Sequence, residues 1–150
     1  MAEQEVLMAV ENLNKWFPVR KMGRARGYVK AVNDVSLQIR RGETLGIVGE
    51  SGCGKTTLGR AMIRLTDVTD GRVIFDGQDI SRLSEKELRP LRRDMQIIFQ
   101  DPYSSLNPRM TVGDIISEPL VYQNMYSASE RIDRVRELMD LCGLDPVYIR

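Results

Sequence analysis

The stretch Gly49-Glu50-Ser51-Gly52-Cys53-Gly54-Lys55-Thr56 decides how this chain is interpreted, because it contains the complete G-x-x-x-x-G-K-[ST] pattern of a phosphate-binding loop. Immediately before it, the apolar run Thr44–Val48 predicts a strand that is buried on both faces of a sheet. Immediately after it, the apolar residues of Lys55–Leu65 recur at helical spacing. The order strand, glycine loop, helix is the local structure that such a loop requires, whereas an ordinary glycine-rich turn needs no lysine and threonine at its end.

Each residue type of the loop has a physical role toward a phosphate. Glycines allow positive φ and a close backbone approach, so that successive N–H groups and the helix N-terminus point at the phosphate oxygens. Lys55 is predicted to contact the β- and γ-phosphates, Thr56 to ligate Mg²⁺, and Thr57 to lie near the α-phosphate. The predicted nucleotide-binding residues of this segment are Gly49, Glu50, Ser51, Gly52, Cys53, Gly54, Lys55, Thr56 and Thr57. Cys53 occupies a position that the motif leaves free, so we expect its thiol to be incidental. The alternative is that oxidation of this thiol blocks nucleotide binding.

The flanking segments predict a mixed α/β domain. Before the loop, alternation predicts strands near 5–11 and 31–40, and the basic segment Lys15–Lys30, with its proline and glycines, is expected to be a solvated loop. After the loop, residues 72–75 predict a strand that leads into an Asp76-Gly77 hairpin turn, and Met95–Phe99 predicts another buried strand.

Beyond residue 100 the pattern becomes helical. Thr111 with Asp114 predicts an N-cap before a helix over 112–120, and Ser127 with Glu130 forms a capping box for a helix that Gly143 ends.

Composition excludes several classes of function. The 150 residues carry 22 Lys+Arg against 21 Asp+Glu, so a net charge of +1 gives no overall indication of a nucleic-acid partner. The complete absence of histidine excludes a Ser-His-Asp triad and the usual zinc sites. No apolar run is long enough for a transmembrane helix or a signal peptide, and two cysteines make no disulfide framework. We therefore expect a cytoplasmic protein without direct membrane insertion.

The segments GESGCGKTT, and MQIIF followed by Gln100-Asp101, together resemble the ABC transporter ATPases. The resemblance implies an α/β P-loop NTPase fold, the ABC-type nucleotide-binding domain, here incomplete. It further implies that residues 1–100 form the N-terminal part of the ATPase core with an antiparallel β portion, and that 101–150 begin the helical subdomain. The stretch from Gln100 to Leu120 is similar to the subgroup that serves importers of oligopeptides, dipeptides, nickel and glutathione.

Two further site residues follow from the resemblance. Gln100 matches the glutamine that opens the Q-loop, which in the family touches the metal and water site. Without the resemblance, Gln100 would be interpreted as an ordinary loop amide. Phe17 lies at the position where family members have the ring that stacks on adenine. Trp16 and Tyr28 are alternatives for this role. The competing interpretation is that Phe17 simply packs on the sheet. The expected catalytic residues are Lys55 and Gln100, and the expected metal ligands are Thr56 and Gln100.

The resemblance implies ATP and Mg²⁺ as cofactors. It also implies a second ABC ATPase subunit and transmembrane permease subunits as partners, with the protein peripheral on the inner face of the cell membrane. The family's Ser-Gly-Gly-Gln signature, its Walker-B Asp-Glu and its switch histidine are missing from these 150 residues. We therefore expect an N-terminal fragment with negligible ATPase activity. The alternatives are another P-loop NTPase or kinase, and a non-catalytic nucleotide-binding or interaction module.

Overall fold

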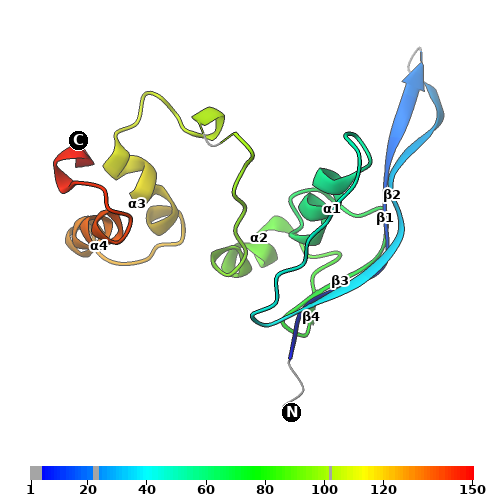
Figure 1. Ribbon diagram of the computed structural model, residues 1–150, viewed down its shortest axis with the longest axis horizontal. Coiled ribbons are helices and arrows are strands. Elements are labelled where there is room, and N and C mark those ends of the chain that lie inside the picture. The colour runs from blue at the N-terminus through cyan, green and yellow to red at the C-terminus, as the bar shows by residue number, and fades with distance from the viewer. Residues whose placement is uncertain (1–4, 22–23, 102) are drawn as a thin grey trace. The chain divides into compact units, whose positions relative to one another are not determined.

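The computed structural model describes residues 5–21, 24–101 and 103–150, which form two compact units that divide after Leu88. The first unit holds an antiparallel sheet of four strands in the order β2-β1-β3-β4, with helix α1 beside it (Figure 1). The strands are β1 (Val6–Lys21), β2 (Arg24–Arg40), β3 (Asp70–Phe75) and β4 (Gln78–Asp79). The predicted antiparallel β portion is therefore confirmed.

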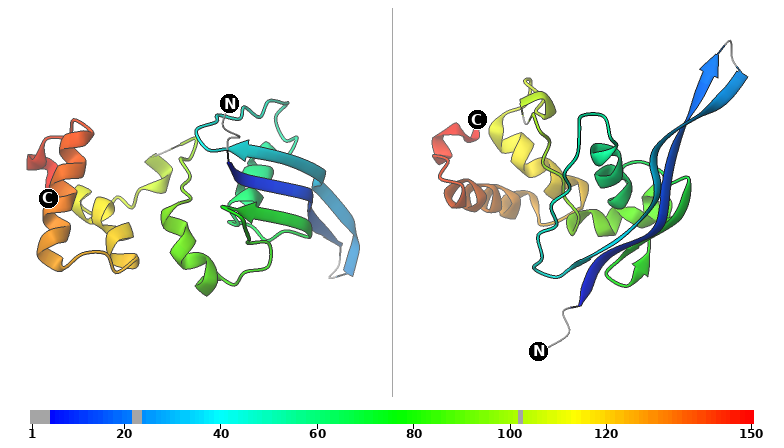
Figure 2. Two further views of the ribbon diagram at one scale, coloured as in Figure 1. Left: turned by 90° about the horizontal axis from the view of Figure 1, so that it is seen from below. Right: turned by 45° about the vertical axis from the view of Figure 1, so that its right-hand side comes forward.

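The strands β1 and β2 form a long hairpin whose outer half we call the arm, residues 15–30. They pair from Val6↔Arg40 out to Lys21↔Arg24, whereas β3 pairs with β1 only as far as Asn14. The arm is consequently two-stranded (Figure 2). Our expectation of a loop over Lys15–Lys30 is wrong, because local cross-strand pairing outweighs the loop-forming residues. Pro18 is tolerated because both strands of the arm are edge strands.

Helix α1 (Lys55–Met62) buries the predicted apolar stripe, Leu58, Ala61 and Met62. Its side chains join a core that the sheet residues dominate, among them Val10, Leu13, Val32, Val73 and Phe75. The helix ends three residues before the predicted boundary, because Arg64 adopts a left-handed conformation with φ of 54°. Leu65 accordingly lies half exposed outside the stripe.

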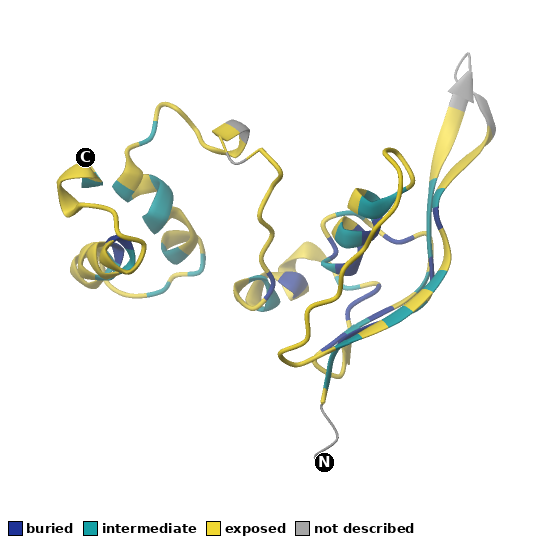
Figure 3. Ribbon diagram, in the orientation of Figure 1, coloured by how far each residue is buried: buried dark blue, intermediate teal, exposed yellow. Residues whose placement is uncertain are grey.

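Two predicted strands are not formed in this chain. Residues 43–50 and 95–99 have no strand partner among the described residues, although both segments are apolar. Val48 and Ile98 are each 94% exposed. Figure 3 shows most of both segments in the colour of exposed residues. The predictions for Thr44–Val48 and Met95–Phe99 are therefore wrong for this chain, because apolar composition favours a strand but only a neighbouring strand can satisfy its backbone groups.

The β3–β4 hairpin turns at the predicted dipeptide. Asp76 and Gly77 both have positive φ, and Phe75 pairs with Gln78, so the turn contains two residues. The carboxylate of Asp76 also accepts a hydrogen bond from Arg41, and the hydrogen bonds of Arg41 to Glu5 and to Asp76 together raise the pKa of its guanidinium. The interpretation of Asp76 as a turn residue is confirmed.

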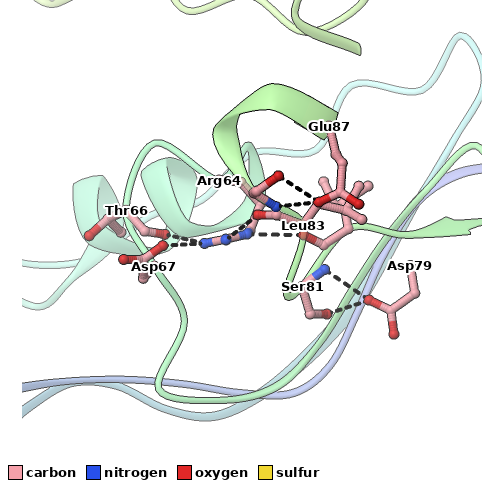
Figure 4. Close-up of polar contacts among 9 residues, drawn as sticks. Arg64, Thr66, Asp67, Asp79, Ser81, Leu83 and Glu87 are labelled. Carbon is pink, nitrogen blue, oxygen red and sulfur yellow. Dashed lines mark hydrogen bonds and ion pairs between the residues drawn. The ribbon is translucent and has the colours of Figure 1, made fainter. Parts of the chain in front are cut away.

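The buried Arg64 fastens the segment after α1 to the segment after β4 (Figure 4). Its Nε donates to the Ile80 carbonyl at 3.0 Å, and its Nη2 donates to the Leu83 carbonyl at 3.2 Å. In the same loop, buried Ser81 donates from both its N–H and its hydroxyl to Asp79, and this holds the pKa of the Asp79 carboxyl below its usual range.

A short helix, α2 (Glu85–Leu88), ends the first unit. The second unit begins with the 3₁₀ helix η1 (Arg89–Arg93) and continues with η2 (Tyr103–Ser105), α3 (Val112–Tyr122), α4 (Ala128–Leu141) and η3 (Pro146–Ile149).

Both long helices of the second unit begin at the predicted caps. Thr111 with Asp114 and Ser127 with Glu130 each form a complete capping box. Gly143, with φ of 70°, follows the end of α4 as predicted. Among the described residues, no helix combines the length and apolar character that crossing a bilayer requires.

Candidate functional site

The phosphate loop lies in the first unit and leads directly into α1. Gly52 and Gly54 have φ of 80° and 100°, conformations that other residues rarely adopt. Gly54 is the N-cap of α1, so the helix begins at Lys55, as predicted. The glycine positions of the motif thus produce the turn that directs the chain into the helix.

Lys55 spans its own loop. Its ammonium group donates to the carbonyl oxygens of Gly49 and Glu50, each at 2.7 Å, and lies 3.6 Å from the Cys53 sulfur. Both carbonyls belong to the start of the motif, so the lysine holds the loop closed across its mouth. The positive charge is therefore positioned over the loop by backbone acceptors instead of by a carboxylate.

The N-terminus of α1 differs from those of α3 and α4. The latter two carry side-chain capping boxes, whereas Gly54 has no side chain and gives α1 no side-chain cap. The N–H groups of the first turn and the positive end of the helix dipole are thus free of a capping side chain. This arrangement fits an anionic ligand such as a polyphosphate.

The predicted metal ligand of the loop is the Thr56 hydroxyl. Thr56 is exposed on the first turn of α1. Within the described residues there is no group of three or more Cys, Asp or Glu side chains that could hold a metal ion by themselves. A cation at this loop would need further ligands, such as the phosphate oxygens of a bound nucleotide.

Strand β2 closes one side of the loop. A Cβ atom placed on Gly54 would overlap the backbone oxygen of Ala31, so β2 and the loop are packed backbone to backbone. Ala31 follows Lys30, which pairs with Trp16 across the hairpin. The aromatic residues at the base of the arm are therefore connected to the phosphate loop through two successive residues of β2.

Replacing Gly54 with alanine is expected to disrupt the site. The new Cβ would clash with the Ala31 carbonyl, and φ of 100° would be strained, so we expect at least a tenfold loss of Mg-ATP affinity together with a lower melting temperature. Gly52→Ala is the matched control, because its φ of 80° is equally demanding but no atom lies within 4 Å of the new Cβ. Equal behaviour of the two variants in calorimetric titration would contradict the role of the Ala31 contact.

The three aromatic candidates cluster on the arm, together with two lysines. Trp16 and Tyr28 have ring centroids 6.3 Å apart. The Lys30 ammonium lies 4.8 Å from the Trp16 ring centre, and the Lys15 ammonium lies 5.0 Å from that of Phe17. Phe17 is 42% exposed and Tyr28 is 61% exposed, whereas Trp16 is half-buried. Phe17 and Tyr28 thus have surface that a ligand could reach, whereas Trp16 is the less accessible of the three rings.

Gln100 belongs to the second unit, whereas the loop and the aromatic residues belong to the first. Its side chain is exposed. The neighbouring Asp101 accepts a hydrogen bond from the Tyr103 N–H at 3.1 Å. The phosphate-loop residues are therefore brought together within one unit, and the metal and catalytic roles of Gln100 stay predictions.

A hollow of about 490 Å³ lies within the second unit, among α3, α4 and η3. Its lining includes Asp114, Arg131, Val135 and Ile149 and none of the predicted site residues. This hollow is therefore separate from the predicted phosphate loop.

Two features of the site were missed by sequence reasoning. The contact between Gly54 and the Ala31 carbonyl joins residues 23 positions apart through the backbone, for which side-chain patterns carry no signal. The lysines over the aromatic rings could have been found, because Lys15 precedes Trp16 directly and Lys30 follows Tyr28 by two residues.

The chain is similar to proteins of one family along most of its length. The family described as ABC transporter matches residues 32–149. The oligopeptide transport ATP-binding protein AppF of Bacillus subtilis is 51% identical over 98% of this chain and 46% of its own length. The glutathione import ATP-binding protein GsiA of Pectobacterium atrosepticum is 46% identical over 99% of this chain and 24% of its own length. The chain thus spans about half the length of AppF and less of GsiA.

Solved structures of similar fold agree with these relatives. The ATP-binding cassette MJ0796, in a dimeric post-hydrolysis state bound to ADP and phosphate, matches with a TM-score of 0.78 and 29% identity. That match covers 95% of this chain and 60% of the solved chain. The chain therefore has the fold of part of an ATP-binding cassette.

Proposed function

Because this chain belongs to the ABC transporter family, we propose that its phosphate loop binds Mg-ATP as part of the ATP-binding subunit of an importer for peptides or related small solutes. The observation that carries the proposal is the loop itself, in which Lys55 lies across the mouth and α1 presents an N-terminus without a side-chain cap. The relatives that transport oligopeptides and glutathione support the solute class.

The proposed roles of the residues follow from their positions. Lys55 would exchange its contacts with the Gly49 and Glu50 carbonyls for contacts with β- and γ-phosphate oxygens. The loop N–H groups and the helix N-terminus would hold the remaining phosphate charge, with Thr57 near the α-phosphate. The Thr56 hydroxyl would supply one ligand to Mg²⁺, which neutralises phosphate charge when it is bound.

Three further assignments complete the proposed site. Ser51 and Cys53 contribute backbone to the loop, Phe17 stacks on the adenine, and Gln100 is a metal ligand. The support for Phe17 is its partly exposed ring at the base of the arm, next to Trp16, whose backbone N–H donates to the Thr69 hydroxyl. The support for Gln100 is its place after the apolar segment 95–99.

We further propose that the 150-residue chain binds ATP without appreciable turnover. It contains no histidine, and its described residues hold no carboxylate cluster that could organise an attacking water beside a metal. A second ATPase subunit and transmembrane permease subunits are the proposed partners, at the inner face of the cell membrane. The support is the dimeric state of the similar cassette MJ0796 and the transport function named for the relatives.

A Mg-ATP titration followed by tryptophan fluorescence tests the binding proposal. Trp16 is the only tryptophan, and it lies at the base of the arm, where β2 meets the loop. We expect a saturable change in its emission with ATP. Absence of binding in parallel calorimetry, with a folded sample by circular dichroism, would overturn the proposal.

A further inference from the structure

Two aromatic residues at the base of the arm, Trp16 and Phe17, lie on opposite faces of the hairpin, because successive side chains of a strand alternate between its faces. Trp16 has Lys30 as its cross-strand partner, and Phe17 has Val29. Each ring also has a lysine of its own. The Lys30 ammonium lies 4.8 Å from the centre of the Trp16 ring. The Lys15 ammonium lies 5.0 Å from the centre of the Phe17 ring. A single adenine can stack on only one of these two faces.

The Phe17 face is the more accessible of the two. The Phe17 ring is exposed, and so is its cross-strand partner Val29. Trp16 is half-buried, and the Tyr28 ring lies beside it, with 6.3 Å between the ring centres. The indole N–H of Trp16 is buried and, within the described part of the chain, has no hydrogen-bond partner. A base therefore reaches the Phe17 ring with less rearrangement than the Trp16 ring.

The side chain of Lys15 is directed to the Phe17 ring. The pairing of β1 with β2 shifts register on both sides of Lys15, and such a bulge re-aims the side chain that it carries. Lys15 is half-buried and forms no ion pair with another described residue. By contrast, Arg41 and Arg72 on the body of the sheet each have an acidic partner. At 5.0 Å from the ring centre, the ammonium is within the range of cation–π attraction.

The position of the ammonium limits where a base can stack. A base inserted between the ammonium and the ring would need a gap of about 7 Å, twice the usual separation of non-bonded atoms. The observed distance from the Lys15 nitrogen to the ring centre is 5.0 Å. One face of the Phe17 ring is consequently closed to a base, and the opposite face is left for stacking.

We propose that Lys15 is a positioning residue of the adenine site: its ammonium holds the Phe17 ring and closes one face, so that the base stacks on the other. This inference rests on the proposed function, because it requires that Phe17 stacks on the adenine. Lys15 acts through the ring and contacts neither the base nor the phosphates. A ring that is held before binding loses less freedom when the base arrives, and this raises affinity.

Calorimetric titration of the 150-residue chain with Mg-ATP and with Mg-tripolyphosphate tests the proposal. Lys15→Met keeps the unbranched side chain and removes its charge. We expect the variant to bind Mg-ATP about two- to fivefold more weakly, the range that an exposed cation–π contact contributes. Binding of Mg-tripolyphosphate should be unchanged, because that ligand has no base and uses only the loop. A merely structural role of Lys15, or a direct phosphate contact, would weaken the binding of both ligands. Lys15→Arg retains a cation and should restore most of the ATP affinity.

A second background and a matched control make the test specific. In a Phe17→Leu chain, Lys15→Met should cause no further loss of ATP affinity, since the ring through which it acts is gone. Lys30→Met removes the same charge from the opposite face, over Trp16, and should leave ATP affinity unchanged.

Several results would overturn the role of Lys15. They are unchanged ATP affinity of Lys15→Met, an equal loss for tripolyphosphate, an equal loss in Lys30→Met, and a full additional loss in the Phe17→Leu chain. Each of these leaves ATP binding by the wild-type chain intact, so the proposed function would stand. Absence of ATP binding by the folded wild-type chain would overturn the proposed function, and the role of Lys15 with it.

Discussion

Replacing Lys55 with methionine is expected to weaken Mg-ATP binding by about 10- to 100-fold, the loss that corresponds to a hydrogen bond from a charged group. The ammonium group lies over the loop mouth, 2.7 Å from two backbone oxygens, and Lys55 is the only basic residue in the loop sequence 49–56. Methionine keeps the unbranched chain and helix propensity, so the change removes charge and donors more than packing. Calorimetric titration of both proteins with Mg-ATP measures the difference.

Two comparisons make the Lys55 result specific. Lys86→Met removes a lysine from an exposed position of α2 and should leave ATP affinity unchanged. AMP, which lacks the β- and γ-phosphates, should bind the wild-type and Lys55→Met chains equally weakly. Undiminished ATP affinity of Lys55→Met would remove Lys55 from the proposed site, whatever the behaviour of the other loop residues.

The phosphate loop and the helix caps could be predicted from sequence because both depend on local interactions. The loop glycines, the start of α1 at Lys55 and the capping boxes at Thr111 and Ser127 each involve residues at most a few positions apart. Their side-chain chemistry specifies a conformation without reference to the rest of the chain. The Asp76-Gly77 turn belongs to the same group.

The errors concern elements whose structure depends on distant partners. Thr44–Val48 and Met95–Phe99 have strand composition, but no described strand lies beside them to complete a ladder. In the arm, a segment predicted to be a loop forms strands instead. Its glycines and Pro18 favour a loop, but β1 and β2 pair with each other along it. Sequence patterns report which conformation a segment favours, and pairing determines whether a strand forms.

Arg64 shows the same limit at a single residue. The sequence places it within the periodic helix pattern of 55–65, where an arginine is an ordinary surface residue. In the structure it is 6% exposed and lies beyond the end of α1, where its guanidinium fastens segments up to 19 residues away (Figure 4). The long-range contacts are to the backbone oxygens of Ile80 and Leu83, which carry no sequence signal.

Arg64→Ala is expected to lower the free energy of unfolding by about 2–4 kcal/mol, because the Ile80 and Leu83 carbonyls lose their donors and a cavity replaces the buried side chain. Urea denaturation followed by circular dichroism measures this loss. Asp67→Ala is the matched control, because Asp67 forms the salt bridge with Arg64 but is 88% exposed, so its loss should cost less than about 1 kcal/mol. Arg64→Lys should be intermediate, since one ammonium group cannot reach both carbonyls in the arginine geometry. If Asp67→Ala destabilises as much as Arg64→Ala, the ion pair and not the backbone contacts holds the end of α1 in place.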